Sequence, residues 1–141
     1  MKKQGWLWAL FGLYLAVLLR LTVFRDGFLD HGLFTGRVEL AAFAYLAKLA
    51  RAGRWRYFTY LFVGNLVWFV PMGAWARLRG RSFAVGLLWT FLLSLGVEVS
   101  QFVFGCGVSE LDDLILNTLG GCLGWLATNF LCRRRRRKTT S

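Results

Sequence analysis

The fold of this chain is decided by residues 82–104, which read SFAVGLLWTFLLSLGVEVSQFVF. A helix rises about 1.5 Å per residue, so this stretch can cross the roughly 30 Å hydrocarbon core of a bilayer. It nevertheless contains Glu98, with Gln101 almost one turn later. A carboxylate inside a membrane is unfavourable unless it faces a polar interior, which makes Glu98 a candidate functional residue.

Three other apolar stretches have a similar length, at residues 6–24, 57–76 and 114–132. With 57% apolar residues and a mean hydropathy of +0.49, the composition excludes an ordinary water-soluble domain. We predict an all-α integral membrane protein, a bundle of four transmembrane helices within one domain at residues 1–132.

The charge distribution predicts how the bundle lies in the membrane. The formal net charge is +11, and residues 133–138 are six consecutive cations within a basic tail, 133–141. Basic residues gather on the cytoplasmic side of membrane proteins, where they meet anionic lipid head groups. We therefore expect both termini in the cytoplasm and membrane lipids, rather than nucleic acid, as partners. Apolar residues at helical spacing in 38–50 predict an interfacial helix between the first two spans.

Polar residues in the last two spans predict a site. Residues spaced four, four and three apart form one helical stripe in the third span, and three more polar residues open the fourth. Since a short connection joins these spans, they are antiparallel neighbours whose polar groups meet at one depth, toward the outer surface. The residues concerned are Thr90, Ser94, Glu98, Gln101, Asp112, Asp113 and Asn117.

Arginines are expected near this cluster as well. Arg20 and Arg25 lie at the outer end of the first span, and Arg37 follows in the loop. Arginines could bind a phosphate or carboxylate, the acids could hold Mg²⁺ or another hard divalent cation, or Glu98 could be a general base. The alternative is structural, with these residues forming ion pairs and helix caps. His31 is the only histidine, which argues against a histidine-ligated metal centre, and we assign no metal ligands.

Small residues in the fourth span predict close helix packing. Gly120, Gly124 and Thr128 are four residues apart, a spacing that lets another helix approach closely. That helix could belong to this chain, to a second copy in an oligomer, or to a larger partner.

Several stretches resemble the motifs of VanZ-like proteins. They are residues 64–73, GNLVWFVPMG, residues 97–101, VEVSQ, and residues 111–120, LDDLILNTLG. Residues 21–25, LTVFR, are similar to the end of that family's first helix. The resemblance extends from the first predicted span to the last.

The resemblance implies a multi-pass protein of the bacterial cytoplasmic membrane, in a family whose namesake is associated with resistance to the glycopeptide teicoplanin. We expect essential, catalytic acids at Glu98 and Asp113. Substrate-binding residues are expected at Arg20, Arg25, Arg37, Asn65, Gln101, Asp112 and Asn117. The ligand would be a lipid-linked envelope molecule or a glycopeptide. A membrane enzyme acting on a lipid-linked substrate, and a small scaffold subunit, remain alternatives.

Overall fold

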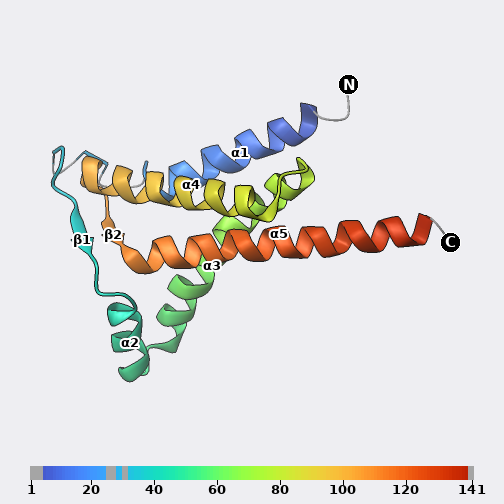
Figure 1. Cartoon of the computed structure of the whole chain (residues 1–141). Helices are drawn as coiled ribbons and strands as arrows, with labels where there is room; N and C mark the ends of the chain where they lie inside the picture. Colours follow the sequence, from blue (N-terminus) through green and yellow to red (C-terminus); the bar gives the residue numbers. More distant parts are fainter. Residues whose placement is uncertain (1–4, 25–27, 30–31, 140–141) are drawn as a thin grey trace.

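The structure is a computed structural model that describes residues 5–24, 28–29 and 32–139. Four of its helices are long and apolar enough to span a membrane, which confirms the predicted all-α membrane fold. In chain order the elements are α1 (Gly5–Thr22), β1 (Arg37–Glu39), α2 (Ala44–Arg51), α3 (Trp55–Leu78), α4 (Phe83–Phe104), β2 (Val108–Glu110) and α5 (Leu111–Thr139), as Figure 1 shows.

The predicted spans agree with the observed helices to within a few residues, except at the end of α5. This helix does not end at residue 132 but continues to Thr139, through most of the basic tail. Arginine and lysine are good helix formers, and cations near a helix C-terminus interact favourably with its dipole. The basic tail therefore extends the last helix instead of forming a separate segment.

The predicted surface helix at 38–50 is correct only in its second part. Residues 37–39 form β1, which pairs in parallel with β2, so that Val38 lies opposite Ser109. Phe43 then adopts a left-handed backbone conformation with φ 58°, and α2 begins at Ala44. Backbone pairing with a distant strand has overridden the helical spacing of the apolar residues.

The helix that uses the small-residue seam is α3. A Cβ atom at Gly120 or Gly124 would collide with the backbone carbonyls of Leu66 and Val70, and one at Gly73 with the carbonyl of Gly121. Figure 1 shows α3 crossing α5, and these contacts place the three glycines where the two helices meet. The predicted close packing is thus satisfied within the chain, and the seam is not free for a partner.

Backbone hydrogen bonds anchor the far end of α4 to the preceding loop. The amides of Leu29, Phe34 and Gly36 donate hydrogen bonds to the last carbonyls of α4. These carbonyls receive no hydrogen bond from an amide of the helix itself. Gly105, with φ 60°, terminates the helix in the left-handed conformation. The loop after α1 is therefore held against the same end of the bundle as the connection from α4 to α5.

The two ends of the molecule differ in what they carry. The start of α1 and the end of α5 lie at one end, while β1, β2 and α2 lie at the other (Figure 1). The end of α4 and the start of α5 meet at this strand end. This arrangement places the predicted polar residues together.

Candidate functional site

A pocket with a volume of about 710 Å³ opens at the strand end of the bundle. Its walls come from both strands, α2, α3, the end of α4 and the start of α5. The lining residues are Arg37, Val38, Glu39, Tyr45, Tyr57, Leu61, Gln101, Val108, Glu110 and Asp113. Three of the predicted site residues are among them, namely Arg37, Gln101 and Asp113.

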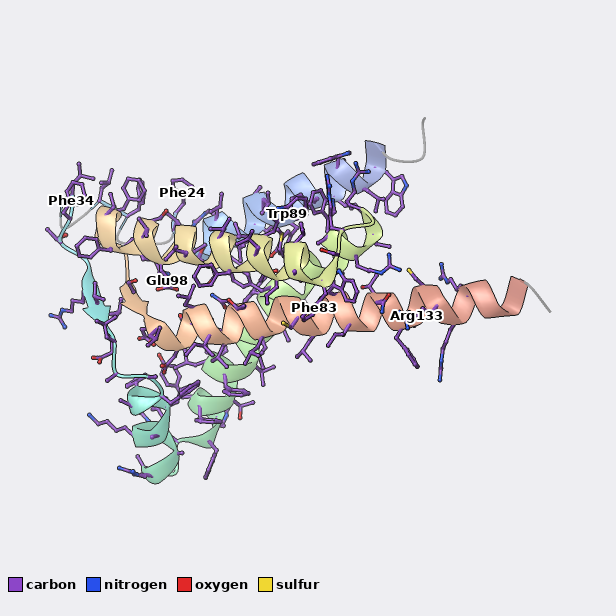
Figure 2. The ribbon with its side chains drawn as sticks, viewed as in Figure 1. Phe24, Phe34, Phe83, Trp89, Glu98 and Arg133 are labelled. Atoms are coloured by element: carbon purple, nitrogen blue, oxygen red, sulfur yellow. The ribbon has the colours of Figure 1, made fainter. Side chains whose placement is uncertain are left out.

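The polar stripe of α4 faces the protein interior, as predicted. Thr90, Ser94, Glu98 and Gln101 are all buried. Figure 2 shows Glu98 between α4 and the start of α5. The stripe is thereby kept from the lipid-facing surface of the helix, where polar groups are strongly disfavoured.

The carboxylate of Glu98 binds a backbone amide of β2. Its side chain is only 4% exposed, and its Oε2 atom accepts a hydrogen bond of 2.8 Å from the amide of Glu110. Glu98 is not among the described residues that line the pocket. Its carboxylate therefore holds β2 in place, behind the pocket wall, while the catalytic role expected for it stays a prediction.

The adjacent aspartates Asp112 and Asp113 have different surroundings. Asp112 is buried and accepts a hydrogen bond from the amide of Phe43, the left-handed residue before α2. Asp113 accepts a hydrogen bond from the amide group of Asn65 on α3 and also lines the pocket. Asp112 and Asn65 thus support the walls, and Asp113 is exposed to whatever enters.

The two buried amides are each only half satisfied. Asn117 donates to the hydroxyl of Ser94 at 2.9 Å, and Gln101 donates to the carbonyl of Thr22 at 3.2 Å. In the described part of the chain, Gln101 Oε1 and Asn117 Oδ1 have no hydrogen-bond partner. A buried carbonyl oxygen without a donor is unfavourable by about 1–3 kcal/mol.

The expected convergence of arginines is only partly seen. Arg37 lines the pocket from β1, but Arg20 is exposed and its guanidinium donates to the carbonyl of Phe24 instead. Arg25 lies outside the described residues, as does His31. The pocket therefore has one described cation, Arg37, where the sequence suggested three.

The acids do not form a metal centre. Within the described ranges, no group of three or more His, Cys, Asp or Glu side chains is arranged to hold a metal ion. Glu39 and Glu110 lie opposite each other in the pair of β1 and β2, and Asp113 lines the pocket from α5. The Mg²⁺ site that the sequence left open is not supported by this geometry.

Four polar pocket residues, Glu39, Glu110, Tyr45 and Tyr57, were not assigned as site residues from the sequence. Glu39 and Glu110 are brought together by the pairing of β1 with β2, which no sequence motif announces. Tyr45 and Tyr57 belong to α2 and α3. Tyrosines near the ends of membrane helices are a common interfacial feature, and this was the one available signal for them.

Negative charge is concentrated at this end. The five acidic residues in the described ranges all lie in the pocket wall or directly behind it: Glu39, Glu98, Glu110, Asp112 and Asp113. Burial raises the pKa of Glu110 above its usual value, and the nearby carboxylates of Asp112 and Glu39 raise it further. The pocket is thus acidic in a protein whose net charge is +11.

Comparison with known proteins identifies the family. The VanZ/LLP1 family model matches residues 11–132, which is most of the chain. The chain belongs to the VanZ/LLP1 family. This VanZ/LLP1 protein is also similar to the curated Protein VanZ of Enterococcus faecium, with 33% identity over 64 residues.

The similarity to Protein VanZ is partial. It covers 44% of this chain and 40% of the length of that relative. No solved structure matches this VanZ/LLP1 protein. The matched range of the family, 11–132, nevertheless contains all nine predicted site residues, from Arg20 to Asn117.

Proposed function

We propose that this protein lies in the cytoplasmic membrane of a bacterium and lowers susceptibility to teicoplanin-type glycopeptides. It would do so by engaging a cell-envelope molecule or the glycopeptide itself in its polar pocket. The observation that carries the proposal is the 710 Å³ pocket, built on buried polar side chains from several helices in a VanZ/LLP1 protein. Polar side chains inside a membrane protein are energetically unfavourable, and they mark functional sites.

The distribution of charge supports an outward-facing pocket. Arg79 lies over the ring of Trp8 near the start of α1, and Arg77 lies over the ring of Trp125 on α5. Arg133, toward the end of α5, is labelled in Figure 2. The acids lie at the other end of the bundle. Positive residues favour the cytoplasmic side, so the pocket would open toward the cell envelope.

The proposal is tested with pocket variants in a susceptible host. We expect Asp113→Asn and Arg37→Gln to bring the teicoplanin inhibitory concentration back toward that of cells without the protein. Arg51→Gln is the matched control, because Arg51 is exposed on α2 and is not among the described pocket-lining residues. If both pocket variants protect as well as wild type at equal membrane abundance, the pocket is not the source of protection.

A membrane enzyme acting on a lipid-linked envelope substrate is the second candidate. It is favoured by one observation: Asp113 lines the pocket, and the buried acid Glu98 lies close enough to interact with it electrostatically. Paired carboxylates of this kind can act as general acid and base. Turnover of envelope lipids that is lost in Asp113→Asn, with the lipid still bound, would favour the enzyme over a binding protein.

A further inference from the structure

The described wall of the pocket carries more acidic than basic side chains. Three carboxylates line it, those of Glu39, Glu110 and Asp113, against the single guanidinium of Arg37. Glu98 and Asp112 add negative charge directly behind the wall. A concave site with charge of one sign concentrates ligands of the opposite charge.

Gln101 provides an independent indication of a missing donor. Its side chain is 7% exposed and lines the pocket, and its amide nitrogen is already used by the carbonyl of Thr22. Its Oε1 atom, which can only accept, has no partner in the described structure. This oxygen is buried, so a ligand N–H group satisfies it only when the Gln101 side chain turns toward the pocket.

The aromatic and apolar parts of the wall indicate the kind of cation. In the part of the chain that the structure describes, no group of three or more His, Cys, Asp or Glu side chains is arranged to hold a metal ion. The pocket also contains the rings of Tyr45 and Tyr57 and the apolar side chain of Leu61. Aromatic faces attract ammonium groups, and apolar walls accept the carbon chain attached to them.

We propose that the pocket binds the ammonium group of a primary amine that carries an apolar chain. The ammonium would bind against the acidic wall at Glu39 and Glu110, which the strand pairing places opposite each other, with Asp113 nearby, while Tyr45 and Tyr57 contact its carbon chain. Gln101 Oε1 would accept a hydrogen bond from the ammonium once its side chain turns toward the pocket. Arg37 would pair with an anionic group where the ligand has one, as in an aminophospholipid head group. This inference rests on the pocket of the proposed function and names the ligand chemistry that the pocket takes.

The first experiment measures binding of hexylamine to the full chain in maltoside micelles by calorimetry. We expect hexylamine to bind, and hexanol and hexanoate not to bind. Glu110→Gln removes one of three attracting charges and is expected to weaken binding about tenfold, as expected for a close charge pair. Equal binding of hexanol, or unchanged affinity in Glu110→Gln, would overturn the proposal.

A second variant is expected to change the hexylamine affinity in the opposite direction, which damage to the fold would not do. Arg37→Gln removes the one described cation of the pocket, so it should strengthen hexylamine binding. Arg51→Gln removes an exposed arginine of α2 outside the pocket wall and should change nothing. Weaker binding in Arg37→Gln, with wild-type helical content, would contradict an ammonium site.

The source of the amine is distinguished by the lipid around the protein. If the ligand is a lipid, the head-group amine of phosphatidylethanolamine nanodiscs would compete with hexylamine. N-acetylated phosphatidylethanolamine and phosphatidylglycerol have no free amine and would not compete. If phosphatidylethanolamine does not compete, a soluble amine is the ligand class, provided that hexylamine binds in phosphatidylglycerol nanodiscs. If hexylamine fails to bind in nanodiscs of every lipid tested, both sources are excluded.

These measurements involve no antibiotic, so the two proposals can fail separately. Amine binding in a protein whose Asp113→Asn and Arg37→Gln variants still protect cells would refute only the pocket's role in protection. Protection that depends on Asp113, without any amine binding, would refute the ligand class alone.

Discussion

Glu110 contributes negative charge to the pocket, and its backbone amide is bound by a side chain of α4. Its amide is held by Glu98, and its carboxylate lines the pocket close to Glu39 and Asp112. Burial and these two acids raise its pKa, so the folded protein binds this proton more tightly than the unfolded chain does. The stability contributed by protonated Glu110 is fully present below its unfolded pKa and is lost as the pH rises through the raised folded value.

We therefore expect Glu110→Gln to raise the melting temperature near neutral pH and to leave it unchanged in acid. The charged groups around this position are Glu39, Asp112, Glu98, Asp113 and Arg37, and the substitution removes repulsion from the four acids among them. Thermal unfolding in micelles from about pH 4 to about pH 8 spans the carboxylate range and measures the effect. A variant whose melting temperature stays below that of wild type at neutral pH would show that the ionised form is stabilising.

Among the helices, the closest association is between α3 and α5. Gly120 and Gly124 let the backbone of α3 approach until any added Cβ would meet the carbonyls of Leu66 and Val70. Without water in the bilayer, such van der Waals contact is a main source of helix association.

Gly124→Ala should destabilise the bundle by about 1–3 kcal/mol, because the methyl group forces α3 away. Gly64→Ala, also inside an apolar helix, is the matched control, since a Cβ there meets no atom within 4 Å. It should be neutral or slightly stabilising, because alanine is the better helix former. Unfolding in mixed micelles would measure both, and equal stabilities would show that the seam is not tightly packed.

The elements were predictable to the extent that their signals are local. Length and hydropathy suffice for the four spans, and the spacing of Gly120 and Gly124 indicates close packing. The three-residue strands have no such signal, because β1 exists only through β2, about seventy positions away. Helical spacing was therefore extended too far, over residues 38–43, where the backbone instead pairs with β2 or turns at Phe43.

For the molecule as a whole, cations and acids separate to opposite ends. At the end with the termini, Arg77, Arg79 and Arg81 lie over the rings of Trp125, Trp8 and Trp89. Arginine–tryptophan pairs of this kind are suited to the interface between lipid and water. The acids and the pocket occupy the other end.

This separation gives a prediction of topology. In a variant whose native cysteines are replaced by serine, Thr35→Cys should react with a membrane-impermeant maleimide in intact cells. Arg133→Cys should react only after permeabilisation. Both positions are exposed, so reactivity reports the side of the membrane. Labelling of Arg133→Cys in intact cells would invert the proposed orientation.

The site was predictable at the level of the whole fold but not in its details. Periodicity and a short connection were enough to bring Glu98, Gln101 and Asp113 together. They could not reveal that the Glu98 carboxylate accepts a hydrogen bond from a backbone amide, because that hydrogen bond depends on where β2 lies. Nor could they show that Arg20 turns to the carbonyl of Phe24, away from the acids.

The crossing of α3 over α5 also has a consequence for biogenesis. A ribosome delivers the second span to the bilayer long before the fourth, yet the fourth carries the glycines against which Leu66 and Val70 pack. During that interval the nascent helix has no partner for its flattest face. The tight contact between α3 and α5 therefore forms only after α5 has entered the membrane, and the insertion machinery or surrounding lipid covers this face of α3 until then.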